Sequence, residues 1–493
     1  MPINLKNRSF HINKYYQLIL MGILVQIIYL FFANNYYKIG FPLDDSWIHL
    51  TYARNLREFG QWFFIPGISS AGSTSPLWTI LLTPGFFFPS PFFYFWTFAL
   101  SGMLFISSAI VFQKLFEKIV NKEFNIPWAG FLFLLEWHLI WSVNSGMETM
   151  LFILILLILF YYMVTKRMKY LWFFWLLLGI VVFVRPDGIT LIGPYLMLNF
   201  IYFLKKDSFS FKNLFFSLLV IILFFVFYAF FNYQLSGEFL PTTFYAKQAE
   251  YQMLYSRPFI NRFFELFLVP ITGVGVLLFP GFIYFLLISI KQRKWEILSA
   301  YLWFFGYLLI YAVRLPVTYQ HGRYVFPTIP IYLLLSAVGI YTIFQVSFKN
   351  SNLFLFGYKT AMSATLIIFF IVGGQAYAKD VAIIETEMVD TAKWIGENLP
   401  SDSIIAAHDI GALGFFANRQ IIDLAGLISP EVIPFIRDEK KLANYMDLSD
   451  VDYLVVFPDW YAELNQLKAE IYSTGGVFSP QAGGENMTIY IWN

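Results

Sequence analysis

Two adjacent carboxylates, Asp44 and Asp45, begin a polar segment in a chain that is otherwise strongly apolar. The segment covers residues 41–78 and directly follows the first long apolar run. A carboxylate where a helix leaves the bilayer is costly to bury and must be solvated or paired. It is also a group that can take a proton from an attacking hydroxyl. The pair is therefore a candidate general base, with its two roles divided because adjacent like charges push one pKa upward.

A structural reading of this pair is open as well. Residues 46–59 have the spacing of a short amphipathic helix lying on the membrane, with Trp47, Ile48, Tyr52 and Leu56 on its apolar face. One of the two aspartates is expected to cap this helix. A purely structural role for both is the less favoured alternative.

Two further polar motifs stand near apolar runs. The loop 67–78 is rich in Gly and Ser, and Ser73 and Thr74 are expected to offer hydroxyls to a sugar pocket. A surface loop that ends in a Pro-started helix is the alternative. Glu148 follows Gly146 at the start of another apolar run. It is either a second active-site carboxylate or an acid that favourably meets a helix dipole.

The candidate anion-binding side chains lie in loops between apolar runs: Arg185, Lys247, His321 and Arg323. An arginine fork matches phosphate oxygens in two-point contact, and a lysine acts as a point charge. Arg185 could instead pair with Asp187, and arginines at membrane interfaces commonly extend toward water. Taken together with the carboxylates, these cations predict one site for a phosphate-bearing ligand and an acid–base reaction.

The composition places these motifs in a membrane protein. Hydrophobic residues make up 58% of the 493 residues and charged residues only 13%, against about 25% charged residues in soluble domains. The net charge of +2 suggests no nucleic-acid partner. The absence of cysteine excludes disulfides, thiolate chemistry and cysteine metal sites.

We expect about eleven transmembrane helices, each roughly 17 to 25 residues long. Their expected ranges are 15–36, 91–113, 126–142, 147–164, 170–184, 189–204, 211–232, 266–290, 296–314, 324–346 and 357–377. The run 76–88 is too short and is expected to be re-entrant or interfacial.

Basic residues alternate with the polar motifs along these loops. By the positive-inside bias, the basic loops and the N-terminus are expected to be cytoplasmic and the polar motifs extracytoplasmic. The basic loops hold Lys6, Arg8, Lys14, Lys114, Lys118, Lys122, Lys166, Arg167, Lys169, Lys205, Lys206, Lys212, Lys291, Arg293, Lys294, Lys349 and Lys359.

The composition changes after Tyr377, which predicts two domains. Residues 1–378 form the membrane domain, and residues 379–493 contain no spanning run. Short apolar runs at 403–407 and 453–457 have strand length, and residues 385–399 have helical periodicity. We therefore expect a small extracytoplasmic α/β domain at the C-terminus.

The assembled motifs resemble the GT-C superfamily of membrane glycosyltransferases, which use polyprenyl-phosphate-linked sugars. Within it, the chain is most similar to the bacterial group that includes the mycobacterial terminal arabinofuranosyltransferase. The resemblance covers about residues 40–430 and rests on the order and spacing of Asp44–Leu50, Tyr52–Leu56, Gly72–Trp78, Ser145–Thr149, Arg185–Gly188, Leu240–Phe244 with Lys247, Arg323–Tyr324, Asp409–Gly414 and Asp423–Leu427.

The resemblance implies an inverting transfer of a hexose or pentose to an acceptor hydroxyl at the outer face of a bacterial inner or plasma membrane. Asp44 would be the general base and Asp45 would position it or bind a neighbouring group. Arg185, Lys247 and Arg323 would hold the lipid phosphate as it leaves. Many relatives carry an Arg where this chain has Thr51, so the function of that Arg is either missing here or supplied by Arg54. A divalent metal at the aspartates is left open.

The implied partners are a polyprenyl-phosphate sugar donor, membrane lipids, and a glycan, lipid or protein acceptor. Two other function classes are open. A transporter or flippase of lipid-linked sugars would place ionisable residues near the bilayer midplane and show repeated halves, and neither feature is present here. A non-catalytic glycan-binding scaffold would leave the aspartates and the cations without a role.

Overall fold

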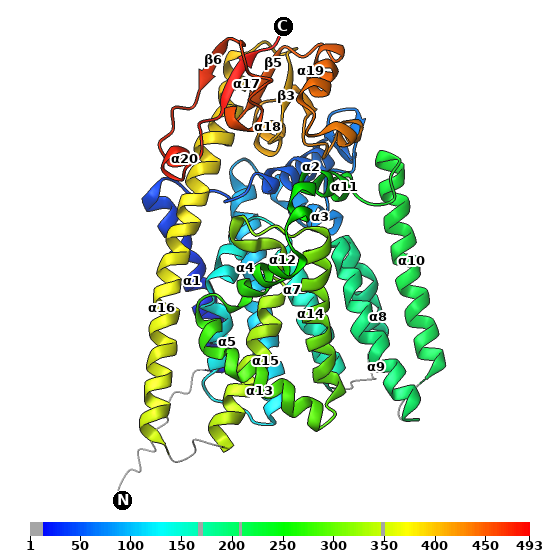
Figure 1. Cartoon of the computed structure of the whole chain (residues 1–493), viewed down its shortest axis with the longest axis vertical. Coiled ribbons are helices and arrows are strands. Elements are labelled where there is room, and N and C mark those ends of the chain that lie inside the picture. The colour runs from blue at the N-terminus through cyan, green and yellow to red at the C-terminus, as the bar shows by residue number, and fades with distance from the viewer. Residues whose placement is uncertain (1–12, 166–170, 207–209, 347–350) are drawn as a thin grey trace, which may run out of the picture.

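The structure is a computed structural model that describes residues 13–165, 171–206, 210–346 and 351–493. Long helices form a bundle, and a small α/β part lies at one end of it, next to the C-terminus (Figure 1). The basic residues Lys6, Arg8, Lys166, Arg167, Lys169 and Lys349 lie outside the described residues. The apolar helices of the bundle and the sheet at the C-terminus confirm the predicted fold class, a polytopic helical protein with a small C-terminal sheet domain.

Eight helices in the described ranges are long and apolar enough to cross a membrane. Two shorter apolar helices, α7 (Thr149–Thr165) and α8 (Leu171–Ile180), lie among them. The eight are α1 (Lys14–Tyr36), α4 (Phe92–Val120), the segment Pro186–Leu204 with α9 (Ile192–Leu204), α10 (Phe211–Ser236), α13 (Val274–Lys291), α14 (Trp295–Arg314), α15 (Thr328–Val346) and the segment Asn352–Asn398 with α16 (Asn352–Ile383).

The expected single span at 126–142 is wrong. The structure forms α5 (Trp128–Leu134) and α6 (Trp137–Val143) there, with a break at Glu136. The Glu136 carboxylate accepts the backbone N–H of Leu139 at 2.9 Å and so caps α6. A carboxylate that caps a helix replaces missing backbone partners, which favours a new helix start over a continuous one. Residues 76–88 also form only short helical pieces, beginning with α3 (Pro76–Leu82).

Helix α2 (Asp45–Phe59) fills the space between the bundle and the C-terminal part (Figure 1). Residues 46–53 are all buried, so this part of α2 is enclosed by protein and does not lie on a membrane surface as its periodicity predicted, whereas residues 57–59 are exposed. Helix α2 packs against α3 and against α18 (Gly411–Phe416). Neither aspartate caps α2 through its side chain. Both carboxylates instead bind partners elsewhere in the chain.

The C-terminal part contains a five-stranded sheet in the order β4-β3-β5-β7-β6. Strands β3, β4 and β5 are mutually parallel, and β7 runs antiparallel to both β5 and β6. The loop after β3 carries His408 and Asp409 toward the bundle. The strands are β3 (Ile404–Ala407), β4 (Gln420–Asp423), β5 (Tyr453–Val456), β6 (Glu470–Ser473) and β7 (Thr488–Ile491).

Helix α16 connects the two parts without a loop. It runs from Asn352 to Ile383 and continues as a π-helical turn, Ile384–Val389, into α17 (Asp390–Asn398). Figure 1 shows it as the long yellow helix that rises along the bundle to the sheet. Other elements are β1 (Phe63–Ile65), β2 (Ile68–Ser69), α11 (Thr242–Glu250), α12 (Phe259–Leu268), the turn Gln320–Val325, α19 (Glu439–Leu448) and α20 (Phe478–Gln481).

Candidate functional site

Two cavities meet at the N-terminal end of α2. The membrane-side cavity, of about 580 Å³, lies among α2, α7, α11 and α14. The domain-side cavity, of about 480 Å³, lies between the bundle and the C-terminal sheet. Both are lined by the same five residues: Leu43, Asp45, Ile48, Lys247 and Arg323. A ligand in either cavity can therefore reach the same carboxylate and the same two cations.

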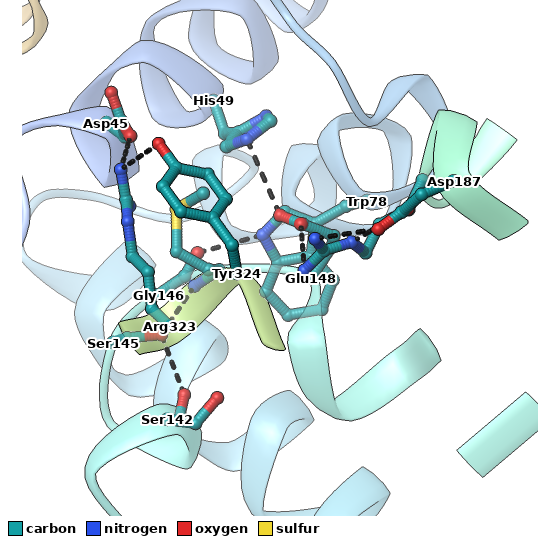
Figure 2. A network of polar contacts seen from close by, with 12 residues as sticks. Asp45, His49, Trp78, Ser142, Ser145, Gly146, Glu148, Asp187, Arg323 and Tyr324 are labelled. Atoms are coloured by element: carbon teal, nitrogen blue, oxygen red, sulfur yellow. Dashed lines mark hydrogen bonds and ion pairs between the residues drawn. The ribbon is translucent and has the colours of Figure 1, made fainter. Parts of the chain in front are cut away.

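Asp45 is the centre of this shared wall. Its Oδ2 accepts a hydrogen bond from Arg323 and another from Lys247, whose Nζ lies 3.4 Å away. Figure 2 shows Arg323 and Tyr324 beside Asp45, and Lys247 Nζ lies 5.3 Å from the centre of the Tyr324 ring. Sequence positions 45, 247 and 323 are thus brought together by α2, α11 and the turn before α15. A carboxylate and two cations that are distant in the sequence therefore lie together, as the sequence predicted for these residue types.

The charges around Asp45 set its protonation. Burial acts to raise the pKa of Asp45, but Lys247 and Arg323 outweigh it and hold that pKa well below its ordinary value. In turn Asp45 raises the pKa of Lys247, against the effect of burial. All three groups are therefore charged at neutral pH, and Asp45 becomes more basic when another anion draws the cations away.

Asp44 faces the C-terminal part. Its Oδ2 accepts the backbone N–H of Gly411 at 2.6 Å and its Oδ1 that of Ala412 at 2.8 Å. Both donors belong to the first turn of α18. Burial, joined by the nearby charge of Asp409, raises the pKa of Asp44 despite these donors. Asp44 lines the domain-side cavity, but both of its oxygens are engaged by backbone.

Arg185 lies in the wall of the membrane-side cavity within a network of its own. Its Nε and Nη2 donate to the two oxygens of Asp187 at 3.1 and 3.0 Å. Asp187 also accepts hydroxyl hydrogen bonds from Tyr307 and Tyr311. A bidentate pair sealed by two tyrosines holds Arg185 in place, so the geometry favours the structural alternative that the sequence left open for this residue.

The loop hydroxyls take different places. Thr74 lines the membrane-side cavity, whereas Ser73 is buried beneath it and shares hydrogen bonds with His49 at 3.1 Å and Thr79 at 2.9 Å. Glu148 lines the membrane-side cavity as well. Figure 2 shows its carboxylate facing His49. Ser73 therefore orients the imidazole and has no contact with the cavity.

His321 is not part of the wall of either cavity. Its Nε2 is 2.8 Å from Asp380 Oδ2, which also accepts the indole N–H of Trp141 at 2.8 Å. Its ring packs on Trp137 and Trp141. His321 has a positive φ of 62°, followed by Gly322 at 76°, and this turn delivers the next residue, Arg323, to Asp45. The His321 side chain thus supports the loop rather than a phosphate.

Arg54 points to the C-terminal part rather than to a substrate site. Its guanidinium donates to the carbonyl oxygens of Phe415 at 2.5 Å and Gly414 at 3.0 Å, and it stacks on the Phe415 ring at 4.9 Å. These carbonyls close the last turn of α18, where a cation also meets the helix dipole favourably. Asp44 and Arg54 therefore hold the two ends of the same short helix.

Replacing Arg54 with Ala is expected to lower the free energy of unfolding by about 1.5–3 kcal/mol, because a charged donor to two buried carbonyls is lost. We expect a lower Tm without a change in the KM of any substrate. Thermal unfolding of Arg54→Ala beside Arg57→Ala, an exposed arginine on the same helix, measures the difference. A changed KM with an unchanged Tm would restore the substrate-binding interpretation.

The sequence did not single out two features of the site. Arg314, at the end of α14, lines the membrane-side cavity and donates to Gln248 at 3.1 Å. His408 Nε2 lies 3.3 Å from Glu250 Oε1, joining the sheet to α11. An arginine that closes an apolar run was the available signal for the first. The second needs a contact between residues far apart in the chain, which no local pattern shows.

The His408–Glu250 contact is expected to depend on pH. Burial acts to lower the pKa of His408, but the hydrogen bond to Glu250 outweighs it and raises that pKa. Its stabilisation is therefore fully present below the ordinary histidine pKa of about 6.5 and is lost as the pH rises through the folded-state value. The Tm difference between the wild type and His408→Gln should be larger at pH 6 than at pH 9. An equal or larger difference at pH 9 would contradict this assignment.

No group of three or more His, Asp or Glu side chains within the described ranges is arranged to hold a metal ion. The membrane-side cavity instead has four cationic side chains in its wall, Arg185, Lys247, Arg314 and Arg323, against the carboxylates Asp45, Glu148 and Asp187. Its charge balance favours an anionic ligand.

Sequence comparisons identify only the C-terminal part. Residues 377–490 match the family model described as a domain of unknown function, DUF8728. No curated protein matches the chain.

Solved structures of two kinds share the arrangement of the whole chain. ArnT from Cupriavidus metallidurans in the apo state has a TM-score of 0.60 at 12% identity, over 97% of this chain and 98% of that one. The same protein bound to undecaprenyl phosphate has a TM-score of 0.58 at 11% identity, with the same coverage. The apo Archaeoglobus fulgidus oligosaccharyltransferase has a TM-score of 0.60 at 10% identity, over 92% of this chain and 70% of that one. A further structure of that enzyme is tethered to an acceptor peptide.

At these identities the likeness is one of fold, and it extends over nearly the whole length of the chain. The chain therefore has the GT-C fold of membrane glycosyltransferases.

Proposed function

We propose that the chain is a membrane glycosyltransferase that moves a sugar from a polyprenyl-phosphate donor to an acceptor hydroxyl, with inversion at the anomeric carbon. The observation that carries this proposal is the shared wall, where Asp45, Lys247 and Arg323 line two cavities at once. A transferase needs one carboxylate within reach of two substrates, and a binding scaffold does not. The structure of ArnT with undecaprenyl phosphate supports a lipid-linked donor.

The donor would occupy the membrane-side cavity, with its phosphate on Lys247 and Arg323. Arg314 at the mouth adds a third cation, and Phe225, Leu240 and Ile310 line the path of a polyprenyl tail. The charge of Arg185 is already neutralised by Asp187. This division assigns the phosphate to the cations around Asp45 and assigns Arg185 to the cavity wall.

The acceptor would occupy the domain-side cavity, with its hydroxyl at Asp45. The acceptor oxygen bonds to the anomeric carbon as the bond from that carbon to the phosphate oxygen breaks. The leaving phosphate takes the bonding electrons and is stabilised by Lys247 and Arg323, and the hydroxyl proton passes to Asp45. Both cations contact Oδ2, so we assign the proton to Oδ1.

This mechanism reverses the roles that the resemblance implied for the two aspartates. Asp45 is the proposed base because it lies on the wall of both cavities, whereas the oxygens of Asp44 are bound to α18. The low pKa of Asp45 in the free protein fits the same scheme. A phosphate that draws Lys247 and Arg323 toward itself raises the pKa of Asp45 when both substrates are in place.

The proposed location is a bacterial inner or plasma membrane with the site outside. The described basic loops support this, because those after α4, α9 and α13 lie at the bundle end opposite the sheet (Figure 1). This orientation makes the N-terminus cytoplasmic and the C-terminal part extracytoplasmic by the positive-inside bias.

A transfer assay tests the function. The full chain in lipid nanodiscs is mixed with synthetic undecaprenyl-phosphate-linked pentoses and hexoses and with a mixed glycan acceptor. We expect one donor to be consumed with release of undecaprenyl phosphate, and NMR of the product to show inversion at the anomeric carbon. Failure of the wild-type protein to bind undecaprenyl phosphate would overturn the proposal.

The acceptor is not expected to be anionic, because the wall of the domain-side cavity is acidic. Against Lys247, Arg323 and His408 it holds the carboxylates Asp45, Glu250, Asp380, Asp409, Asp459 and Glu485, together with Asp44, whose pKa is raised. A phosphorylated or sulfated acceptor would meet like charges, which cost several kcal/mol across a binding surface. The rate of transfer to a neutral glycan should therefore exceed the rate of transfer to its sulfated counterpart. The double change Asp459→Asn and Glu485→Gln at the rim should bring the two rates closer together. Preference for the sulfated glycan would contradict this prediction.

A further inference from the structure

A buried carboxylate in the membrane-side cavity lacks the hydrogen bonds that burial requires. Glu148 is only 5% exposed, and its Oε2 has no hydrogen-bond partner within the described ranges. The nearest nitrogen atoms of basic side chains are His49 Nε2 at 3.8 Å from Oε2 and Arg185 Nη1 at 3.7 Å from Oε1. Both distances exceed hydrogen-bond length. An unsatisfied buried acceptor costs free energy unless a ligand supplies the donor.

A second buried polar atom in the wall of the same cavity also lacks a hydrogen-bond partner. Thr243 is 4% exposed, and its hydroxyl Oγ1 also has no partner within the described ranges. The preceding Thr242 differs, because its hydroxyl donates to the carbonyl oxygens of Ala71 and Leu427. Thr242 therefore joins α11 to its neighbours, whereas Thr243 lines the cavity with its hydrogen-bonding capacity unused.

Both side chains lie close to the proposed phosphate site. Thr243 precedes Lys247 by one helical turn on α11, and His49 follows Asp45 by one turn on α2. Residues four apart on a helix have Cβ atoms about 5–6 Å from one another. His49 in turn faces Glu148, as Figure 2 shows. A sugar attached to a phosphate on Lys247 would extend by about one helical turn along the cavity wall. It would therefore reach both the Glu148 carboxylate and the Thr243 hydroxyl.

We propose that Glu148 and Thr243 form the subsite for the transferred sugar and recognise its free ring hydroxyls, with Glu148 accepting hydrogen bonds from them. This inference rests on the proposed function and names the donor class: a sugar whose ring hydroxyls are unmodified where they face Glu148. Arg185 is hydrogen-bonded to Asp187 and lies 3.7 Å from Glu148, so it leaves the Glu148 carboxylate able to accept hydrogen bonds from a ligand. Thr243 Oγ1 completes the recognition from the opposite helix.

The test compares two probes in nanodiscs: bare undecaprenyl phosphate and the best wild-type donor among undecaprenyl-phosphate-linked pentoses and hexoses. We expect the wild type to bind the sugar-bearing lipid more tightly. Glu148→Gln should reduce that preference about tenfold or more, since a hydrogen bond to a charged group is lost. Thr243→Val should reduce it several-fold, in line with a neutral hydrogen bond. Affinity for bare undecaprenyl phosphate should stay the same in both variants.

The matched control is Glu58→Gln, the same substitution at an exposed position on α2. It should leave the affinities for the bare lipid phosphate and for the sugar-bearing lipid unchanged. Both test variants are isosteric, and if one fails to fold the other carries the test. Wild-type-like preference in the folded variants would overturn the subsite while leaving the proposed function intact. Failure of the wild type to bind bare undecaprenyl phosphate would overturn the proposed function itself. Equal binding of a donor deoxygenated at each ring position would also overturn hydroxyl recognition.

Discussion

Replacing Asp45 with Asn is expected to lower the rate constant of sugar transfer about 10³-fold, because an amide cannot take the acceptor proton and a positioned base contributes roughly 10²–10⁴-fold. The same change should strengthen the binding of undecaprenyl phosphate, since Lys247 and Arg323 lose the carboxylate that they now contact. Single-turnover transfer and equilibrium binding of the lipid measure the two effects. A slower transfer rate together with tighter lipid binding is expected only if Asp45 is the base and shares Lys247 and Arg323 with the donor phosphate.

The comparison with Asp44→Asn decides between the two aspartates. The Asn side chain can accept only one of the two backbone N–H groups of α18, so we expect a lower Tm and a rate within about tenfold of the wild type. A 10³-fold loss in Asp44→Asn with an unchanged Tm, beside an active Asp45→Asn, would return the base to Asp44. That outcome would restore the assignment implied by the family resemblance.

Replacing Lys247 and Arg323 together with Met is expected to weaken undecaprenyl phosphate binding about 10²–10⁴-fold. Each charge-assisted hydrogen bond contributes about 1.5–3 kcal/mol, and 1.4 kcal/mol corresponds to a factor of ten. The ionised Asp45 is then left without its partners, so the double variant is also expected to be less stable at neutral pH. Isothermal binding and thermal unfolding of the same preparations separate the two effects.

Single variants refine this second prediction. Arg323→Lys keeps the charge but loses the planar fork, so it should retain part of the affinity. Arg185→Met is the contrasting change, because it removes a cation that Asp187 already neutralises. We expect it to lower the Tm more than the lipid affinity. If Arg185→Met weakens lipid binding more than the double variant does, the phosphate lies at the other end of the membrane-side cavity.

The sequence predicted the fold class and singled out residues that the structure brings together, because both inferences depend on local patterns. Apolar runs of bilayer length identify helices without any knowledge of their partners. Asp45, Lys247 and Arg323 stood out as polar residues beside such runs, and the structure brings all three to one wall. The eleven-span count stays a prediction, since eight helices in the described ranges meet the length and composition requirements.

The remaining differences between expectation and structure come from contacts between distant parts of the chain. Asp44 and Arg54 were predicted to act in the site, and the structure shows their partners at the two ends of α18, more than 350 positions away. The amphipathic pattern of α2 predicted a surface helix because the sequence does not show that distant segments enclose it, with His49 bound to Ser73 and Arg54 bound to α18. Glu136 broke an expected span through a capping bond that composition alone does not predict.

Because α16 continues without a loop into the C-terminal part, this helix also determines how the two cavities are aligned. A helix turns by about 100° per residue, so one residue inserted into α16 between the bundle and the π-helical turn would swing the sheet around the helix axis and withdraw α18 from Asp44. Seven inserted residues would instead lift the sheet by about 10 Å with almost no rotation. The rotational setting of a single helix thus fixes how the C-terminal wall of the domain-side cavity faces Asp44 and Asp45.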